Sequence, residues 1–310
     1  MVAITLTCNP KFNTYQANQD YLDLLRIKDS FFLNIENKGI SIPLIKKQIL
    51  NTDDFDLVTP INFQQTISGI SEELLFSIYS ILKNSGAVSC YLQTKDYITS
   101  SKLEYINIDR FRKNYYFDLR ANEETIISNM KRDAKQRLKK TLKKYTTDII
   151  ENIVSEDFYN NYIQISDTNK FSKNYIFSYD QLKGFSKIKG IKYIEIRESG
   201  NFFSGGFFGY NNDEVDYLYG ADSKDYPDGV RLLIFTAIQY FQKKNFKKLF
   251  LGGGISENDS LANFKLRQGT FEQKCSTIRA VLDIKKAEEY TNNKFSKKWF
   301  DGFFPPYAEI

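Results

Sequence analysis

Three consecutive glycines at the end of an apolar segment constrain the fold of this chain more than any other feature of its sequence. The apolar segment is 249–251, and the glycines occupy 252–254. An apolar helical pattern precedes them at 230–241, and a strand pattern lies before that helix at 215–220. A strand, a helix, a second strand and a glycine turn indicate an α/β unit that binds a ligand at the carboxyl ends of its strands. Glycines at this point let a ligand or another segment of backbone approach closely.

The residues after the glycines favour a ligand site over a plain strand end. Asp259 begins a polar turn, and a Phe-Lys pair, Phe264 and Lys265, follows it. A glycine turn alone would favour a strand end that binds no ligand. An aromatic and a cationic side chain at a short distance from the turn indicate that a ligand binds there.

The length and composition are those of a folded protein with two domains. The 310 residues exceed one ordinary small domain, and 26 Phe and 21 Tyr supply large apolar surfaces. No apolar run approaches the roughly 18 residues of a membrane-spanning helix. Residues 1–8 lack the basic and apolar regions of a signal peptide, so a cytoplasmic location is expected.

The chain contains no histidine, which excludes several classes of catalytic site. A Ser-His-Asp triad, a Cys-His pair and an HExxH zinc site all need imidazole. The three cysteines, Cys8, Cys90 and Cys275, are too far apart in sequence for a CxxC metal site or a disulfide framework. No metal site is therefore expected, and any proton transfer must use Asp, Glu, Tyr, Lys or water.

Basic residues concentrate in one window. The formal net charge of the chain is +5, but residues 131–144 hold eight basic residues and one acid, a net charge of +7. Charges of one sign on a helix repel each other instead of pairing at i,i+4. The window is either a solvated helix face or a contact for an anionic partner. Such a partner would be the phosphates of a nucleotide-sugar, RNA such as tRNA, or a lipid surface in peripheral contact.

The first third of the chain predicts a mixed α/β unit. Segments 31–35 and 39–44 have the pattern of two strands joined as a hairpin. Residues 72–82 have helical spacing, and 87–92 and 114–119 are strand candidates.

A long helix is predicted from Asn122, a suitable N-cap, to about Tyr145. Its apolar residues recur every four positions, and the rest of its surface is basic. The apolar stripe consists of Ile126, Met130, Ala134, Leu138 and Leu142. Farther along, strands at 191–197, 202–210 and 215–221 are predicted to form an antiparallel meander.

Specific segments resemble the GNAT-like acyltransferases related to the Fem peptidyltransferases, the FemAB-like group. The basic helix resembles the one that begins their catalytic half, and 204–210 resembles their central strand. Residues 217–222 resemble the following strand, which carries a substrate-facing aromatic residue. The glycine turn together with 260–265 is similar to their glycine turn and Phe-Lys motif. The order and spacing of these segments over about 115–285 carry the resemblance.

The resemblance implies an α/β fold of the α+β type, with two tandem GNAT-like domains whose mixed sheets are flanked by helices. The N-terminal half is then expected at 1–120, completed by 286–310. The C-terminal, catalytic half is expected at 121–285.

The family joins an acyl or aminoacyl group to an amine, commonly in cell-envelope precursors or surface sugars. The leading expectation is an N-acyltransferase that moves an acetyl group from acetyl-CoA to an amino sugar of a nucleotide-sugar, glycan or peptidoglycan precursor. The alternative is a peptidyltransferase that uses aminoacyl-tRNA. Both donors stay open, because 223–231 has one glycine instead of a glycine-rich CoA loop, and no long heptad arm for tRNA is present. Either donor is a co-substrate, and no permanently bound cofactor is expected.

The resemblance also implies roles for individual residues. Lys265 stabilises an oxyanion, and Phe264 shapes the pocket. Tyr219 orients the acceptor, and Asp222 or Asp259 accepts its proton. The substrate-contacting residues are Gly252, Gly253, Gly254, Lys131, Arg132 and Lys135, and the donor-contacting residues are Gly229, Val230 and Arg231.

A second class of function, a non-catalytic binding protein, fits the same sequence. The GNAT-like halves would then be a scaffold, and the basic helix would hold RNA or anionic lipid.

Overall fold

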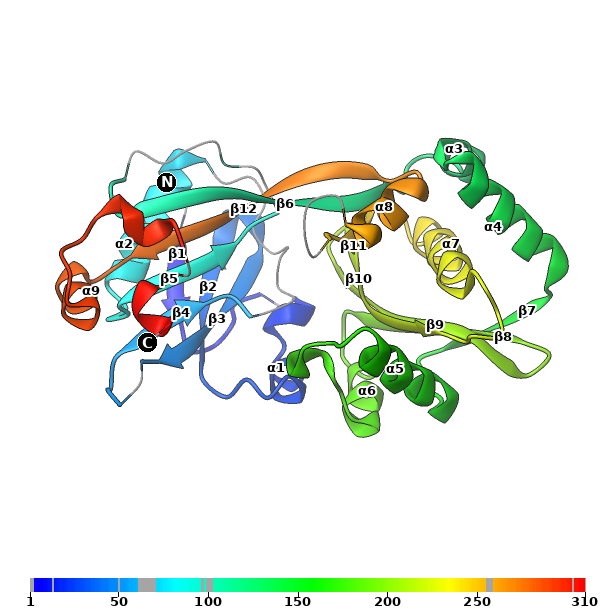
Figure 1. Cartoon of the computed structure of the whole chain (residues 1–310), viewed down its shortest axis with the longest axis horizontal. Coiled ribbons are helices and arrows are strands. Elements are labelled where there is room, and N and C mark those ends of the chain that lie inside the picture. The colour runs from blue at the N-terminus through cyan, green and yellow to red at the C-terminus, as the bar shows by residue number, and fades with distance from the viewer. Residues whose placement is uncertain are drawn as a thin grey trace. The chain divides into compact units, whose positions relative to one another are not determined.

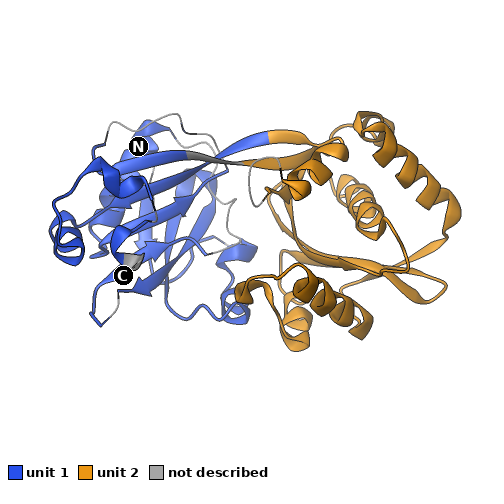
Figure 2. Cartoon of the chain, viewed as in Figure 1, with its two compact units in different colours: residues 1–112, 273–310 blue, residues 113–272 orange. Residues whose placement is uncertain are grey.

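The chain folds into two compact units, each built from strands and helices. The structure, a computed structural model, describes residues 3–12, 14–49, 51–60, 71–95, 98, 103–254, 259–302 and 304–309. One unit comprises 1–112 with 273–310, and the other comprises 113–272 (Figure 2). The predicted α/β class is confirmed.

The first unit is a sheet with strand order β1-β2-β3-β4-β5-β12. Its described pairs are antiparallel except for β4 and β5, which are parallel. Helix α2 begins after the N-cap Ser71 and supplies the crossover that a parallel pair needs. The predicted hairpin, helix and buried strand are all present. The elements are β1 (Ile4–Thr7), α1 (Gln19–Leu24), β2 (Ser30–Ile35), β3 (Ile40–Gln48), β4 (Phe55–Val58), α2 (Glu72–Lys83), β5 (Ser89–Gln93), β12 (Phe271–Val281) and α9 (Ile284–Thr291).

The second unit has the strand order β6-β11-β10-β9-β8-β7. The predicted meander is confirmed as β8, β9 and β10, and α7 then crosses to β11, which pairs parallel to β10. The elements are β6 (Ile106–Asp118), α3 (Glu123–Asn129), α4 (Arg132–Lys144), β7 (Thr147–Glu151), α5 (Glu156–Thr168), α6 (Tyr179–Phe185), β8 (Ile191–Glu198), β9 (Asn201–Asn211), β10 (Glu214–Asp222), α7 (Gly229–Gln242), β11 (Lys248–Gly252) and α8 (Ser260–Arg267).

The two units repeat one topology, which confirms the predicted tandem organisation. In each, four antiparallel strands lead through a crossover helix to a strand parallel to the fourth: β1–β4, α2 and β5, then β7–β10, α7 and β11. Strand β6, which follows β5 in the chain, neighbours β11 in the sheet. Strand β12, which follows β11 in the chain, neighbours β5. The boundaries between the units fall inside β6 and β12, at 112–113 and 272–273. From the sequence they were expected at 120–121 and 285–286.

The second unit buries apolar side chains on both faces of its sheet. Helix α7 packs on one face, and α5 and α6 cover the other (Figure 1). The α7 face includes Phe203, Phe208 and Leu233, while the other face holds an aromatic cluster around Phe158 and Phe207. Burial on both sides fixes the carboxyl ends of the strands that carry the candidate site.

The predicted single helix from Asn122 to Tyr145 is wrong. The chain forms α3 and α4, because Met130 and Lys131 have extended backbones. Gly269 packs against this break: a Cβ on Gly269 would lie 2.7 Å from the Met130 nitrogen. The contact comes from a distant part of the sequence, so no local signal marks the break. The predicted apolar stripe is also too long, since Leu142 is 44% exposed.

Candidate active site

The candidate site lies where the parallel strands β10 and β11 separate. Their described pairing ends at Asp216 and Phe250. Beyond this point β10 continues to Asp222, whereas β11 ends at Gly252. The carboxyl ends of separating parallel strands are the usual ligand-binding edge of α/β sheets.

The structure brings Lys265 to the glycine turn. Helix α8 carries Lys265 back toward the end of β11, where its Nζ donates a hydrogen bond of 2.6 Å to the Gly253 carbonyl. Gly252 has a φ of +76°, in the left-handed region that favours glycine. A Cβ on Gly252 would lie 3.5 Å from the Lys265 Nζ. The glycines thus shape the turn so that the ammonium group reaches its backbone.

Burial changes the acid–base chemistry of Lys265. The residue is 7% exposed, and this desolvation lowers the pKa of its amine from 10.5 to about 8, against the opposing effect of the Asp259 charge. The group is therefore still mainly a cation near neutral pH, but it is poorly solvated. A desolvated ammonium can stabilise negative charge that develops beside it during a reaction.

Asp259 lies at the other end of the same helix. Its side chain caps α8 by accepting a hydrogen bond of 2.7 Å from the Ala262 amide. The glycine turn, Asp259 and Lys265 therefore form one local group. Residues 255–258, which connect the turn to α8, lie outside the described residues, and Gly254 is the last described residue before them.

Tyr219 lies in an aromatic cluster. An extra residue, Leu218, shifts the pairing of β10 with β9 between Tyr217 and Tyr219. Tyr217 consequently packs with the α7 core, while Tyr219 packs at 4.7 Å from Phe177 and 5.8 Å from Phe185, measured between ring centroids. Tyr219 is 6% exposed, so the ring is part of the packing between β10 and α6.

Asp222 lies at the start of α7. Its carboxylate accepts a hydrogen bond from the Val230 amide, and burial raises the pKa of the carboxyl group. Gly229 fits tightly here, because a Cβ on it would lie 2.8 Å from the Asp222 Cβ and 3.0 Å from the Phe203 oxygen. The helix N-terminus predicted to meet the donor is thus in contact with a carboxylate of the protein itself.

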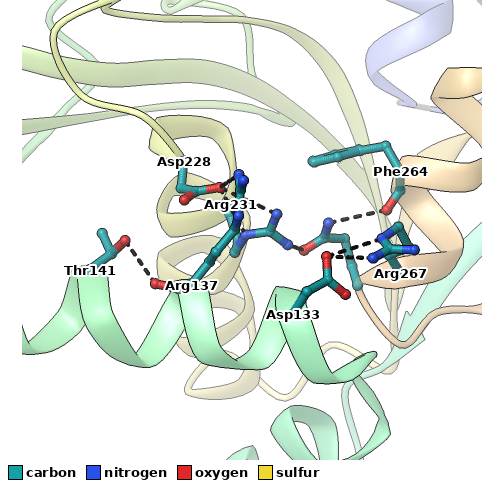
Figure 3. A network of polar contacts seen from close by, with 8 residues as sticks. Asp133, Arg137, Thr141, Asp228, Arg231, Phe264 and Arg267 are labelled. Atoms are coloured by element: carbon teal, nitrogen blue, oxygen red, sulfur yellow. Dashed lines mark hydrogen bonds and ion pairs between the residues drawn. The ribbon is translucent and has the colours of Figure 1, made fainter.

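Arg231 is held in a polar network that joins α4, α7 and α8 (Figure 3). Its Nε and Nη2 lie 3.4 and 3.3 Å from the Asp228 Oδ1, and its Nη1 donates to the Gln268 side chain. Arg137 of α4 reaches the same Asp228 oxygen at 3.3 Å. The Phe264 ring lies 5.7 Å from the Arg231 guanidinium carbon. Burial lowers the pKa of Arg231, and Asp228 opposes this effect.

A second ion pair ties α4 to α8. Asp133 accepts from Arg267 at 2.6 Å, and the Lys131 amide donates to the Arg267 carbonyl at 3.0 Å. These contacts use the one acid in the basic window. The side chains of Lys131 and Arg132 remain exposed, and Lys135 is half-buried.

The exposed face of α4 is basic along its length. Opposite the buried Ala134, Leu138 and Thr141 lie cations and Gln136, with no acid among them. The exposed cations on this face are Arg132, Lys139, Lys140 and Lys143. At about 1.5 Å per residue they extend over roughly 17 Å.

Sequence reasoning missed the Asp228 network. Asp228 has a φ of +74°, a conformation rare for residues other than glycine. Gln268 and Arg137 reach it from segments far away in the chain. The dipeptide Asp228-Gly229 signals a turn, but nothing local identifies the carboxylate as the partner of two arginines.

Proteins of known structure share this fold. FemX superposes with a TM-score of 0.62 at 11% identity, over 87% of this chain and 92% of FemX. The C-terminal domain of a putative lysylphosphatidylglycerol synthetase from Agrobacterium fabrum has a TM-score of 0.52 at 12% identity, over 84% of this chain and 87% of that one. L-PGS from Bacillus licheniformis has a TM-score of 0.51 at 11% identity, over 87% and 93%. The predicted resemblance to Fem-related proteins is confirmed as a likeness of fold.

No protein-family model matches the sequence, and no curated protein sequence matches it. Among the described residues, no helix has the length and apolarity needed to cross a membrane. Within the same ranges, no three His, Cys, Asp or Glu residues are grouped as a metal ion would require.

Asp228→Asn tests whether the network fixes α4 and α7. The amide keeps the shape of the side chain and tolerates positive φ, but it leaves the buried Arg231 without its carboxylate. We expect the free energy of unfolding to fall by about 3 kcal/mol in urea titrations, because a buried charge loses its partner. Asp180→Asn, which breaks the exposed pair with Lys183, should not change stability measurably. Equal stability of both variants would contradict the role given to Asp228.

Proposed function

We propose that this chain is an acyltransferase that moves an acyl or aminoacyl group to an amine. The observation that carries the proposal is the desolvated Lys265 ammonium at the glycine turn, where β10 and β11 separate. The fold shared with FemX and with a putative lysylphosphatidylglycerol synthetase supports the same class. The latter name describes the joining of a lysyl group to a lipid.

In the proposed reaction the amine nitrogen attacks the carbonyl carbon of the acyl donor. An N–C bond forms, the bond from the carbonyl carbon to the donor's sulfur or oxygen breaks, and the amine proton ends on the leaving group. Lys265 stabilises the oxyanion formed between these events. Its attachment to the Gly253 carbonyl positions the ammonium group before substrate arrives.

The neighbouring side chains take supporting roles in this proposal. Asp259 is the carboxylate whose charge acts on Lys265, so it is better placed than Asp222, which contacts the start of α7, to accept the amine proton and pass it to the leaving group. The Phe264 ring of α8 lies over the Arg231 guanidinium of α7, and this contact holds α8 against α7. Tyr219 contributes by packing the end of β10.

The start of α7 favours aminoacyl-tRNA over acetyl-CoA as the donor. A pyrophosphate bound there would need free amide groups and a free cation. The Val230 amide already meets Asp222, and Arg231 is buried between Asp228 and Gln268. We therefore propose that donor phosphates bind elsewhere, on the exposed basic face of α4. The acceptor is then an amine of a cell-envelope precursor, either an amino sugar or a peptide of peptidoglycan.

Lys265→Ala should reduce turnover while leaving acceptor binding unchanged. Loss of one charge-assisted donor to an oxyanion lowers kcat about 100- to 1,000-fold. In the wild type, kcat should also fall as pH rises through about 8, because the amine then loses its proton. Release of free tRNA from aminoacyl-tRNA, or of thiol from acetyl-CoA, in the presence of amine acceptors measures both effects.

Lys189→Ala, at an exposed lysine of the same unit, is the control and should retain full activity. Unchanged turnover in Lys265→Ala would overturn the catalytic role. If RNA binding then depended on α4 alone, the chain would be a binding scaffold.

Neutralising the α4 face should weaken tRNA binding and its salt dependence together. The triple variant Arg132→Gln, Lys139→Gln and Lys143→Gln removes three exposed cations from one line of the helix. The slope of log Kd against log salt should decrease by about 2, since fewer counterions are released. The matched control, Lys187→Gln, Lys189→Gln and Lys243→Gln, changes the net charge equally. Equal loss of tRNA binding in both triples would contradict a dedicated α4 contact, and loss of binding to anionic vesicles instead of tRNA would identify a lipid partner.

A further inference from the structure

Charged side chains follow the side of α4 that contacts α7 and α8. They recur at i, i+4, i+7 and i+11, and are Asp133, Arg137, Lys140 and Lys144. Residues with this spacing lie on one side of a helix. At about 1.5 Å per residue, they extend over roughly 17 Å. This side adjoins the outer face of α4 and shares Lys140 with it.

Arg267 of α8 continues this series, and the five side chains form one charged line. It pairs with Asp133 at 2.6 Å, just as Arg137 pairs with Asp228 at 3.3 Å, on the same side of α4 (Figure 3). The Arg267 and Arg137 side chains are 53% and 62% exposed. Within the described part of the chain, each guanidinium hydrogen-bonds to one carboxylate oxygen only. The carboxylates therefore hold both arginines in place, while most of the five N–H donors of each can meet a ligand.

Aromatic rings lie at the opposite end of the charged line. Tyr145 follows Lys144, whose ammonium donates a hydrogen bond of 2.7 Å to the Tyr145 hydroxyl. The Tyr226 ring lies 5.6 Å from the Tyr145 ring, measured between centroids. Both tyrosines are half-buried, so each keeps part of its surface accessible.

Cations in a line with aromatic rings are typical of proteins that bind single-stranded nucleic acid. The cations meet successive phosphates, and the rings stack against bases. A guanidinium fork also fits two oxygens of one phosphate. A duplex hides the faces of its bases, so it would leave the tyrosines unused. An anionic membrane would need aliphatic side chains on the charged line, and none of its residues is aliphatic.

We propose that the charged line binds the single-stranded 3′ end of an RNA that carries the acyl group, and that Arg267 holds its last phosphate. This inference rests on the proposed acyl transfer, and it specifies how the donor is held. Arg267 is two residues from Lys265 on α8, so that phosphate lies about one helix width, roughly 10 Å, from the ammonium group. An aminoacyl ester is attached to the terminal ribose, one nucleoside beyond the last phosphate. The ester carbonyl can thus reach Lys265 while the outer face of α4 contacts the rest of the RNA.

The double variant Arg137→Gln with Arg267→Gln tests the charged line. The probes are two RNA hairpins with the same base-paired stem, one blunt and one ending in single-stranded ACCA. In anisotropy titrations, the wild type should bind the ACCA hairpin more tightly than the blunt one. The double variant should bind the ACCA hairpin roughly tenfold more weakly, and the slope of log Kd against log salt should decrease by about 1.4, since two phosphate contacts are lost. Its binding of the blunt hairpin should not change.

Two further double variants control the result. Lys139→Gln with Lys143→Gln removes the same charge from the outer face of α4 and should weaken both hairpins alike. Arg137→Lys with Arg267→Lys keeps the charges but not the fork, so it should retain the salt slope. Exposed ion pairs contribute little to stability, so all three variants should melt with the wild type.

Three outcomes would overturn the assignment: a wild type that does not prefer the ACCA hairpin, equal loss of both hairpins when the arginines become glutamine, or unchanged binding by that variant. Loss of coenzyme A binding in place of the ACCA hairpin would indicate a small phosphate ligand and would overturn it too. Lys265→Ala should bind both hairpins normally. ACCA binding that depends on the two arginines without any acyl transfer would leave the charged line standing and remove the proposed function.

Discussion

The hydrogen bond between the Lys265 ammonium and the Gly253 carbonyl is the contact on which the candidate site depends. It joins the end of β11 to α8 and places a poorly solvated cation at the edge where β10 and β11 part. The first unit repeats the same topology, but its crossover strand β5 is followed by Thr94 and Lys95 instead of glycines. The repeated fold therefore supplies two equivalent strand ends, each followed by a buried lysine, and the glycine turn distinguishes the second. This asymmetry is the reason for placing the proposed chemistry in residues 113–272.

The polar network around Asp228 determines what else the second unit can bind. Arg231 and Arg137 share one carboxylate oxygen, and Gln268 takes the other side of Arg231. A buried charge needs such partners, so Arg231 is committed to holding α7 against α4 and α8. This leaves the outer face of α4 as the basic surface of the unit. The exposed cations on this face are accessible to a polyanion.

Local sequence patterns predicted most elements, and long-range contacts account for the errors. The hairpin of β2 and β3, the meander and the β10–α7–β11 unit follow from periodicity, because apolar burial repeats with the period of each element. The break between α3 and α4 depends on Gly269, which lies far along the chain, so the pattern at Met130 gave no sign of it. The candidate site likewise combines residues that local sequence patterns indicate with residues that only long-range contacts define. The glycine turn and Lys265 were predicted from their spacing and the family resemblance, whereas the role of Asp228 is defined by arginines that the fold brings to it.

The pKa of the Lys265 ammonium tests the central claim most directly. Lysine labelled with ¹³C at Cε allows each ammonium group to be titrated by NMR, and Lys265→Met identifies the resonance of interest. Burial at the glycine turn predicts a pKa of about 8 for this group, well below the 10.5 of an ordinary lysine. A resonance from Lys265 that titrates near 10.5 would mean a solvated surface lysine. That result would contradict both the geometry of the turn and the proposed role in catalysis.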